Sequence, residues 1–365
     1  MVFKKEVNLG GKTVGNFSKP FISVDIGSNH NGSLELCKKM IDAAVECGVD
    51  GVKFQAFGLD LFSAACYNDD PRQKKLMEEF PYLKRLFTQV HPNLKEEMAA
   101  WSLTKDMARE IKEYCDEKGT IFFCTPLTVE WADFLVDELD MPFIKVASMD
   151  LNNYPFLRHL ARKKRPIVLS TGLSTMSEIM GAVETIQQEG GTELVVLHCL
   201  SVYPAPAEVT NLRNIDMLRE YFDLPVGFSY NSSGFAMPIA AVARGACVIE
   251  QHFTIDKTLP GWDHAISADP SEMKIVVREA HNVQKALGSY ARQLSAAEVD
   301  KRYHFRRSLV VLKDMSKGAV LLEKDIDFRR PGGIGIQPSE LQFALGRKLK
   351  HDVCCEDIIS FRDLE

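Results

Sequence analysis

The feature that most constrains the fold of this chain is a repeated order of one β-rich run followed by one helical segment. Segments with helical spacing of apolar residues lie at 34–48, 107–119, 129–139 and 177–191. Such alternation indicates a parallel sheet with helical crossovers. The β-rich runs cover residues 21–27, 51–55, 120–126, 143–148, 165–172, 194–201, 225–230 and 246–254.

Eight strands are the number that closes a (β/α)8 barrel, and the span 20–290 has about the usual length of 250 residues. An open doubly wound sheet is the alternative, and it would carry a glycine-rich phosphate turn after its first strand. Residues 27–33 read GSNHNGS and lack that pattern. We therefore expect an α/β fold built as a (β/α)8 TIM barrel.

The alternation ends near residue 290, and the chain after it has short apolar runs and Gly/Pro turns. We expect a barrel domain over 1–290, a linker over 291–305 and a small β-rich domain over 306–365. A domain of roughly 60 residues is marginal alone, so it should dock on the barrel or on a partner subunit. The insert at 56–104 is long for a βα loop and is expected to form a lid or binding loop, or extra rim helices.

Composition excludes several classes of protein. Lys and Arg number 44 and Asp and Glu 50, and this net charge of -6 argues against a nucleic-acid partner. We find neither a run of 18 apolar residues nor a signal peptide, and so expect no membrane span. The nine cysteines are scattered without zinc-binding spacing. They are expected to be buried thiols in a reducing, cytoplasmic compartment.

Polar residues gather where the predicted strands end, which is where barrel enzymes carry their chemistry. The period of two along a strand places Lys53 with Gln55 on one face, and Glu250 with His252 on one face. The candidates at these ends are Asp25, Asn29, His30, Lys53, Gln55, Thr125, Lys145, Ser148, Asp150, Ser170, Thr171, His198, Ser201, Tyr203, Ser229, Asn231, Glu250 and His252.

Lys53 and Lys145, in a site otherwise rich in hydroxyls, point to a small anionic substrate bearing a phosphate or carboxylate. A structural ion pair or a Schiff-base role are the alternatives for a strand-end lysine. His252 beside Glu250 resembles a metal ligand with a nearby carboxylate, as Mn, Fe or Zn would use. A histidine within a strand can equally be a core residue.

Ordered motifs along nearly the whole chain resemble the N-acetylneuraminate (sialic acid) synthase family, whose bacterial members include legionaminic and pseudaminic acid synthases and spore-coat polysaccharide relatives. The C-terminal segment resembles the antifreeze-like (SAF) domain of that family. The motifs are IGSNHNGS (26–33), VKFQ (52–55), CTPL (124–127), KVAS with NNYP (145–155), LSTGLS (169–174), HC-x3-YPAP (198–206), HFTIDK with PGWDH (252–264) and RRPGGIG (329–335).

The resemblance implies condensation of phosphoenolpyruvate with an N-acyl amino sugar, N-acetylmannosamine or a related aldose. It implies that Gln55, Tyr203 and Asp263 face the sugar. Arg330 would reach the N-acyl group from the C-terminal domain of the second subunit, which implies a domain-swapped homodimer. The residues that would hold phosphoenolpyruvate are Lys53, Thr125, Lys145, Ser148, Ser170, Ser201 and Ser229.

The implied chemistry suits these residue types. Carbon C3 of phosphoenolpyruvate attacks the sugar aldehyde, which a divalent metal (Mn²⁺ or Mg²⁺) polarises. Positive charge develops at C2, water adds there, and phosphate leaves by C–O cleavage. A carboxylate near C2 can stabilise the cation and accept the proton of the water. The expected catalytic residues are Asp25, Lys53, Lys145, Asp150 and Tyr203.

Three positions depart from the family pattern. The metal is commonly held by two histidines, and only His252 matches, because Asn231 stands where relatives have the other; His264 is expected in a rim loop. Asp25 and Asp150 stand where relatives have Glu, which withdraws each carboxylate by roughly 1.5 Å. A misplacement of about 1 Å can cost about a hundredfold in rate.

These departures leave other functions open. The chain could perform a related aldol-type condensation on another aldehyde, or could be a non-catalytic sugar-binding paralogue on the same barrel. A Schiff-base aldolase acting through Lys145 is a further alternative.

Overall fold

A parallel eight-stranded sheet forms the centre of the larger of two compact units, Met1–Gly288 and Ser289–Glu365, in the computed structural model. The structure describes residues 3–58, 61–62, 71–79 and 94–365. The strands are β3 (Phe21–Gly27), β4 (Gly51–Ala56), β5 (Ile121–Pro126), β6 (Ile144–Val146), β7 (Ile167–Ser170), β8 (Leu194–Cys199), β9 (Val226–Tyr230) and β10 (Val248–His252).

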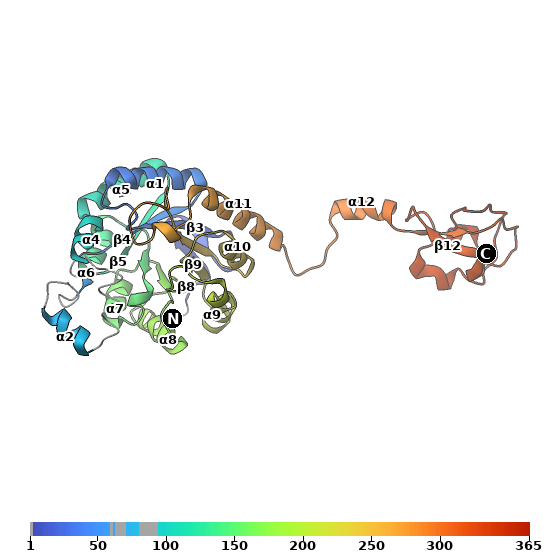
Figure 1. The fold of residues 1–365 in the computed structure, drawn as a ribbon. Helices are drawn as coiled ribbons and strands as arrows, with labels where there is room; N and C mark the ends of the chain where they lie inside the picture. Colours follow the sequence, from blue (N-terminus) through green and yellow to red (C-terminus); the bar gives the residue numbers. More distant parts are fainter. Residues whose placement is uncertain (1–2, 59–60, 63–70, 80–93) are drawn as a thin grey trace. The chain divides into compact units, whose positions relative to one another are not determined.

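The order of hydrogen-bonded strands is β5-β4-β3-β10-β9-β8-β7-β6, and β5 and β6, at the two ends of this order, also lie in contact. The sheet therefore curls into a barrel, which confirms the predicted fold (Figure 1). Strands β3, β8, β9 and β10 are buried along their whole length, because side chains fill the inside and helices cover the outside.

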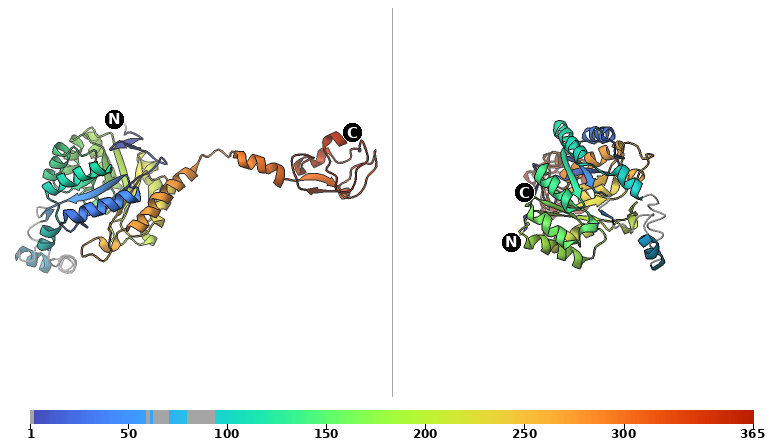
Figure 2. Two further views of the ribbon diagram at one scale, coloured as in Figure 1. Left: turned by 90° about the horizontal axis from the view of Figure 1, so that it is seen from above. Right: turned by 90° about the vertical axis from the view of Figure 1, so that its left-hand side faces the viewer.

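Helices lie outside the strands in every view (Figure 2). Their ends follow the sequence: Ser33, Thr104 and Thr175 cap helix starts through their hydroxyls, and Gly48 and Gly119 end helices in the left-handed conformation. The helices are α1 (Leu34–Cys47), α5 (Lys105–Lys118), α6 (Val129–Asp133) continuing as η4 (Phe134–Glu138), α7 (Tyr154–Arg162), α8 (Met176–Gln188), α9 (Asn214–Phe222), α10 (Ala236–Ala243) and α11 (Pro270–Leu287).

Shorter elements complete the barrel unit. An antiparallel hairpin, β1 (Val7–Leu9) and β2 (Lys12–Val14), precedes the first barrel strand. The 3-10 turns η5 (Ser148–Asp150), η6 (Ala207–Val209) and η7 (His264–Ile266) follow β6, β8 and β10. In the insert expected as a lid, α2 (Pro71–Glu79) and α4 (Leu94–Trp101) are described, and 59–60, 63–70 and 80–93 lie outside the described residues.

The second unit has its own small core around Leu309, Leu321 and Leu349. Strands β11 (Ser308–Val311) and β12 (Ile326–Arg329) pair antiparallel, and 3-10 turns lie at η8 (Glu323–Asp325), η9 (Pro338–Phe343) and η10 (Phe361–Asp363). Helix α12 (Ala296–Phe305) occupies most of the segment expected as a linker.

The expectation of buried thiols is correct for the described cysteines of the barrel unit and wrong for Cys354 and Cys355, which are exposed. These two follow the short turn-rich segments of the second unit, where the core is too small to cover them. Cys66 lies outside the described residues.

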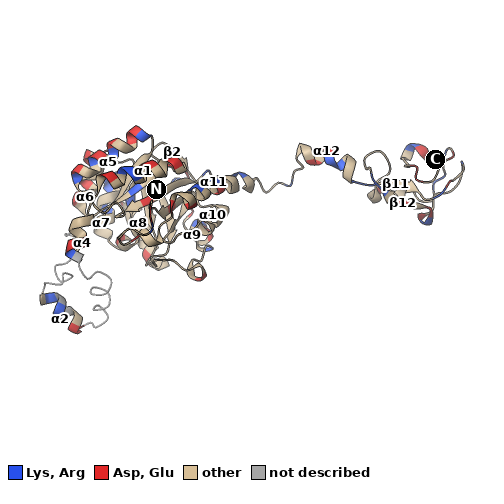
Figure 3. Ribbon diagram, turned by 45° about the horizontal axis from the view of Figure 1, so that its top comes forward, with Lys and Arg blue, Asp and Glu red and all other residues tan. Residues whose placement is uncertain are grey.

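Charges of both signs are mixed along the outer helices, as α1 and α5 show (Figure 3). The net charge of -6 therefore does not correspond to an acidic patch on these two helices. Among the described helices we find none that combines the length and apolarity needed to cross a membrane.

Candidate active site

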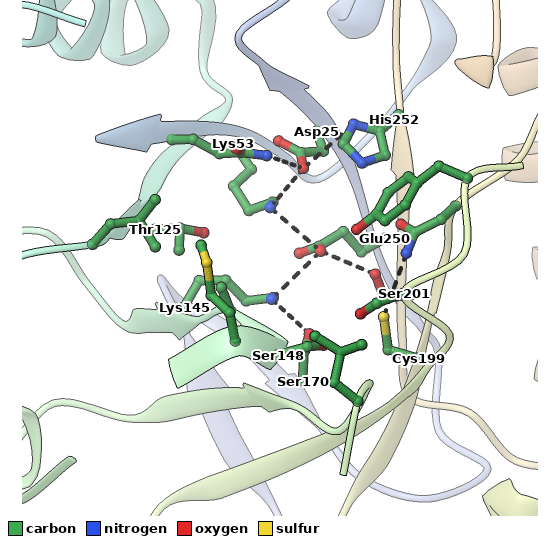
Figure 4. A pocket seen from close by; sticks show the side chains of 18 residues that line it. Asp25, Lys53, Thr125, Lys145, Ser148, Ser170, Cys199, Ser201, Glu250 and His252 are labelled. Carbon is green, nitrogen blue, oxygen red and sulfur yellow. Dashed lines mark hydrogen bonds and ion pairs between the residues drawn. The ribbon is translucent and has the colours of Figure 1, made fainter. Parts of the chain in front are cut away.

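A cavity of about 330 Å³ lies where the barrel strands end, and every one of the eight strands contributes a side chain to it (Figure 4). Its lining is mainly polar and includes two lysines, two carboxylates, one imidazole and several hydroxyls. The lining residues are Asp25, Lys53, Gln55, Thr125, Leu127, Lys145, Ala147, Ser148, Met149, Ser170, Leu173, Cys199, Ser201, Tyr203, Ser229, Asn231, Glu250 and His252.

Asp25 lies beside Lys53 on one neighbouring strand and beside His252 on the other, as the register of β3 with β4 and β10 requires. Lys53 Nζ is 2.7 Å from Asp25 Oδ2, and Gln55 Nε2 donates to the same oxygen at 3.1 Å. Burial would raise the pKa of Asp25, but Lys53, His252 and these hydrogen bonds outweigh it and lower the pKa. Asp25 is therefore held as a carboxylate.

Gly27 makes the contact between Gln55 and Asp25 possible. It sits at a register shift between β3 and β4 with a φ of +54°, and a Cβ there would meet Gln55 Nε2 at 3.0 Å. A side chain at this position would therefore be strained and would displace Gln55.

Glu250 lies between the two lysines. Its Oε1 is 3.4 Å from Lys53 Nζ and 3.6 Å from Lys145 Nζ, and Ser229 Oγ donates to it at 3.2 Å (Figure 4). Burial opposes charge on both lysines, but Asp25 and Glu250 raise the pKa of Lys53 above its ordinary value. The pKa of Lys145 is lowered by burial and by Lys53, although Glu250 opposes this.

Hydroxyl groups surround Lys145. Its Nζ donates to Ser170 Oγ at 2.7 Å and to the Val146 carbonyl at 3.2 Å. Ser148 Oγ accepts from the Gly172 amide at 3.0 Å, and a Cβ on Gly172 would collide with the hydroxyls of Ser148 and Ser201. Glycine at this position thus keeps the hydroxyls close together, and one cation with several hydroxyls is a suitable cradle for a phosphate.

Of the two residues expected to hold a metal, His252 lies beside Asp25, whereas Asn231 lies beside Cys199. Among the described residues, buried His252 has no hydrogen-bond partner for Nδ1, which faces Asp25 Oδ2 at 3.6 Å and Asp263 Oδ2 at 3.8 Å. Asn231 Nδ2 donates to the Leu200 carbonyl at 2.6 Å, so only its oxygen could be a ligand.

Within the described ranges no three His, Cys, Asp or Glu side chains form a ready metal cluster. The nearby carboxylates fit a cation such as Mg²⁺, which keeps several waters and takes few protein ligands. The imidazole nitrogen suits a softer divalent metal.

Tyr203 forms part of the cavity mouth. Its ring centroid lies 6.1 Å from that of His252 in an edge-to-face arrangement, and the side chain is about half exposed. Burial of the hydroxyl end raises the pKa of Tyr203, so the phenol remains protonated. It can therefore donate a hydrogen bond to a substrate oxygen.

Of the strand-end candidates, Asn29, His30, Thr171 and His198 do not line the cavity. Three of the residues to which the family resemblance gave a role do not line it either. Asp150 lies in η5, where its Oδ1 accepts from Asn153 Nδ2 at 3.3 Å and burial raises its pKa. Asp263 lies in the loop after β10 and faces His252. Arg330 belongs to the second unit, where its guanidinium lies 4.9 Å from the ring centroid of Phe305.

His264 lies in the loop after β10, as expected, but its side chain does not face the solvent. It is fully buried, and its Nδ1 is 2.7 Å from Thr254 Oγ1 at the base of its loop. Burial lowers the pKa of His264.

Glu250 is the charged cavity residue that sequence reasoning noted beside His252 but left without a role. The period of two placed it on the inward face, and this was the available signal. Cys199 was also left without a role; it lines the cavity next to Asn231, and burial raises the pKa of its thiol.

Comparisons with known proteins identify the family of this chain. The model of the NeuB family matches residues 40–292. The chain is 35% identical over 360 residues to N,N'-diacetyllegionaminic acid synthase from Legionella pneumophila, covering 98% of each chain. It is 34% identical over 351 residues to the human N-acetylneuraminate-9-phosphate synthase, covering 96% of this chain and 94% of the relative.

A solved structure is also similar. The crystal structure of N-acetylneuraminic acid synthetase from Leptospira borgpetersenii, in complex with citrate, aligns with a TM-score of 0.68 and 31% identity. The alignment covers 82% of this chain and 96% of that one. These similarities confirm the resemblance expected from the motifs.

Proposed function

Because this chain belongs to the NeuB family of phosphoenolpyruvate-dependent, C–C bond-forming synthases, we propose that it condenses phosphoenolpyruvate with an N-acyl amino sugar. The sugar is N-acetylmannosamine or a related aldose, and the products are a nonulosonic acid and phosphate. The named synthases among its relatives make sugar acids of this class.

The observation that carries the proposal is the placement of Glu250 Oε1 between Lys53 Nζ and Lys145 Nζ, at 3.4 and 3.6 Å. Phosphoenolpyruvate carries its carboxylate and its phosphate ester on one carbon, C2. If one lysine binds each anionic group, C2 lies between the lysines and therefore close to Glu250. A fixed carboxylate at that point matches the positive charge that the reaction develops there.

The assignment of groups follows from their surroundings. Lys145 with Ser148, Ser170, Ser201 and Ser229 would bind the phosphate, because hydroxyls supply the additional donors that its oxygens require. Lys53, with Thr125 nearby on β5, would bind the carboxylate.

Electron flow then begins at C3, which attacks the sugar aldehyde and forms the new C–C bond. The resulting charge at C2 is stabilised by Glu250 and, beyond Lys53, by Asp25. Water adds to C2 and gives its proton to the Glu250 carboxylate. The C2–O bond to the phosphate then breaks as the new C2 hydroxyl loses its proton and becomes the keto group, and Lys145 holds the phosphate as it leaves. The aldehyde oxygen, left as an alkoxide by the attack, takes up a proton and becomes a hydroxyl.

The sugar would lie toward Gln55, Tyr203 and Asp263, on the side of the cavity that carries His252. A divalent cation, when bound, supplies Lewis acidity that polarises the aldehyde oxygen. His252 and Asp263 would hold it, with the Asn231 oxygen as a further donor. Arg330 remains proposed as a contact to the N-acyl group from the second subunit of a domain-swapped dimer, and Asp150 as an acid–base group behind Ser148.

The test is a phosphate-release assay with phosphoenolpyruvate and a panel of N-acyl hexosamines, with and without Mn²⁺. Phosphoenolpyruvate labelled with ¹⁸O in the C2–O bridge should pass the label to phosphate, because the C–O bond is the one that breaks. Lys145→Ala should reduce release by about a hundredfold or more. Lys112→Ala removes a surface lysine of α5 and serves as the control.

Two outcomes would count against the proposal. One is a folded protein that binds phosphoenolpyruvate but releases no phosphate with any sugar. The other is label retained in the organic product, since this would indicate P–O cleavage.

A further inference from the structure

The loop between β10 and α11, residues 253–268, carries Asp263 and is closed at its base. Phe253 and Ala268 form a parallel bridge, and the Thr254 amide donates to the Ala268 carbonyl at 3.0 Å. Buried Asn29 joins both ends, because its Nδ2 donates to the Phe253 carbonyl at 2.9 Å and to Ser267 Oγ at 3.0 Å. The base of the loop is therefore fixed to the barrel.

The outer part of the loop is held differently, through Trp262. Its Nε1 donates to Glu97 Oε2 of α4 at 2.9 Å. Its ring meets Trp101 edge-to-face with centroids 5.3 Å apart, and it stacks on Phe57 at 6.0 Å. A tryptophan of the last barrel loop is thus anchored on residues of the insert that follows β4.

Trp262 is the chain neighbour of Asp263, whose Oδ2 lies 3.8 Å from His252 Nδ1. Ser267 Oγ donates to the Asp263 main-chain carbonyl at 2.7 Å, which fixes the backbone after Asp263. Before it, Asn31 Nδ2 donates to the Pro260 carbonyl at 2.8 Å, two residues ahead of Trp262. Between these two bonds the backbone passes through Trp262. A shift of the indole therefore moves the Asp263 carboxylate relative to His252.

We propose that Trp262 is a positioning residue, which anchors the 253–268 loop on α4 and so holds Asp263 in place for the second substrate. Within the described residues Trp262 is not part of the cavity lining, so it acts through Asp263 and does not touch the reacting groups. Lys53 and Lys145 come from strands and share Glu250. Phosphoenolpyruvate binding is therefore independent of this anchor.

The kinetic test compares Trp262→Ala and Trp262→Phe with wild type. Trp262→Ala raises the KM for the sugar by about tenfold or more, since displacements near 1 Å have large effects in an active site. The Kd for phosphoenolpyruvate stays within about twofold of wild type. The reason is that Lys53 and Lys145, which would bind it, come from strands and do not depend on the anchor. Trp262→Phe keeps the ring stacking and loses the bond to Glu97. Its KM for the sugar should lie between the values of wild type and Trp262→Ala.

The matched control is Trp131→Phe, which changes a buried tryptophan of α6 that contacts Phe134. It should change neither constant. Equal changes in the sugar KM and in the phosphoenolpyruvate Kd of Trp262→Ala would overturn the proposal, as would no change in either.

A second measurement is independent of turnover. Hydrogen–deuterium exchange of Trp262→Ala should be faster at the amides of 254–267 and of 94–101, and unchanged in β9. Unchanged exchange in 254–267 would overturn the anchoring role. The kinetic test rests on the proposed condensation, whereas the exchange test does not. If the wild-type protein is inactive with every sugar, the proposed function is refuted. The anchoring role of Trp262 is then decided by the hydrogen–deuterium exchange measurement alone.

Discussion

Glu250 and Lys145 form an ion pair of 3.6 Å across the interior of the barrel, although their strands, β10 and β6, are not neighbours in the sheet. Glu250 also contacts Lys53 at 3.4 Å, so one carboxylate links two cations that come from different strands. Asp25 adds a second carboxylate on Lys53. These four residues, which we call the charged floor of the cavity, therefore pair two carboxylates with two lysines before any substrate binds.

Glu250→Gln should separate binding from chemistry. The amide keeps the shape of the side chain but removes the charge that would face C2 and the base that would accept the proton. We expect kcat for phosphate release to fall about a hundredfold or more, without weaker phosphoenolpyruvate binding. Ser229→Ala, which removes the 3.2 Å hydrogen bond to Glu250 and one of the four hydroxyls proposed to bind the phosphate, is the milder comparison. A kcat near wild type in Glu250→Gln would disprove the assignment.

Lys53→Met should destabilise the barrel. It leaves Asp25 without its lysine and Glu250 with Lys145 alone, at a site where these side chains are nearly inaccessible. Breaking a buried pair by removing one partner costs about 3–5 kcal/mol. Urea unfolding measures this loss, and adding Asp25→Leu should recover part of it. Lys112→Ala breaks an exposed pair with Asp116 and should cost below about 1 kcal/mol. Equal costs for the two lysine variants would contradict the prediction.

The value of kcat/KM for phosphoenolpyruvate should fall at alkaline pH because Lys145 loses its proton. Burial and Lys53 lower its pKa, so Lys145 loses its proton earlier than an ordinary lysine as the pH rises. Binding of phosphoenolpyruvate needs the charged form, so kcat/KM for phosphoenolpyruvate should fall as the pH rises through this lowered pKa. Bound phosphate favours the cation, so the limb in kcat should lie at higher pH.

The same limb should respond to Glu250, which raises the pKa of Lys145 more than Cys199 and Asp25 do. In Glu250→Gln the alkaline limb of phosphoenolpyruvate affinity should therefore move to lower pH. Binding measured by calorimetry across the alkaline range checks this. A limb at the same pH in both proteins would assign it to another group.

Asn231→His should tighten the binding of a divalent metal. It would place a second imidazole in the cavity that His252 lines, where the wild type offers an amide oxygen. We expect Mn²⁺ affinity to rise by more than the roughly tenfold that outer-shell changes produce. Titration followed by Mn²⁺ paramagnetic resonance measures it, with His252→Ala as the variant that should lose binding. Equal affinity in Asn231→His and wild type would argue against this metal position.

The barrel and much of its cavity could be predicted from the sequence because both depend on local patterns. The period of two and the polar residues at strand ends were enough to bring Lys53, Lys145 and His252 to one place. The role of Glu250 could not be read in the same way. Its partners lie on β4 and β6, and only the closure of the barrel determines which side chains meet across its interior.

Contacts between loops were also beyond the sequence. The burial of His264 depends on Thr254 and on the closed base of its loop. The contact of Trp262 with Trp101 joins residues from the insert and from the last barrel loop. Neither apolar spacing nor turn residues report which loops will lie together, because each loop is locally compatible with many arrangements.

The closed base of the 253–268 loop has a consequence for engineering. A segment whose two ends are joined to each other and to Asn29 can be exchanged as a cassette without altering the strands that carry it. The strand ends are not separable in this way, since Asp25, Lys53, Glu250 and Lys145 each need a partner from another strand. Laboratory evolution toward a different aldehyde should therefore randomise residues 256–261 and leave the charged floor untouched. Libraries that randomise Asp25, Lys53, Glu250 and Lys145 instead would be dominated by variants that fail to fold.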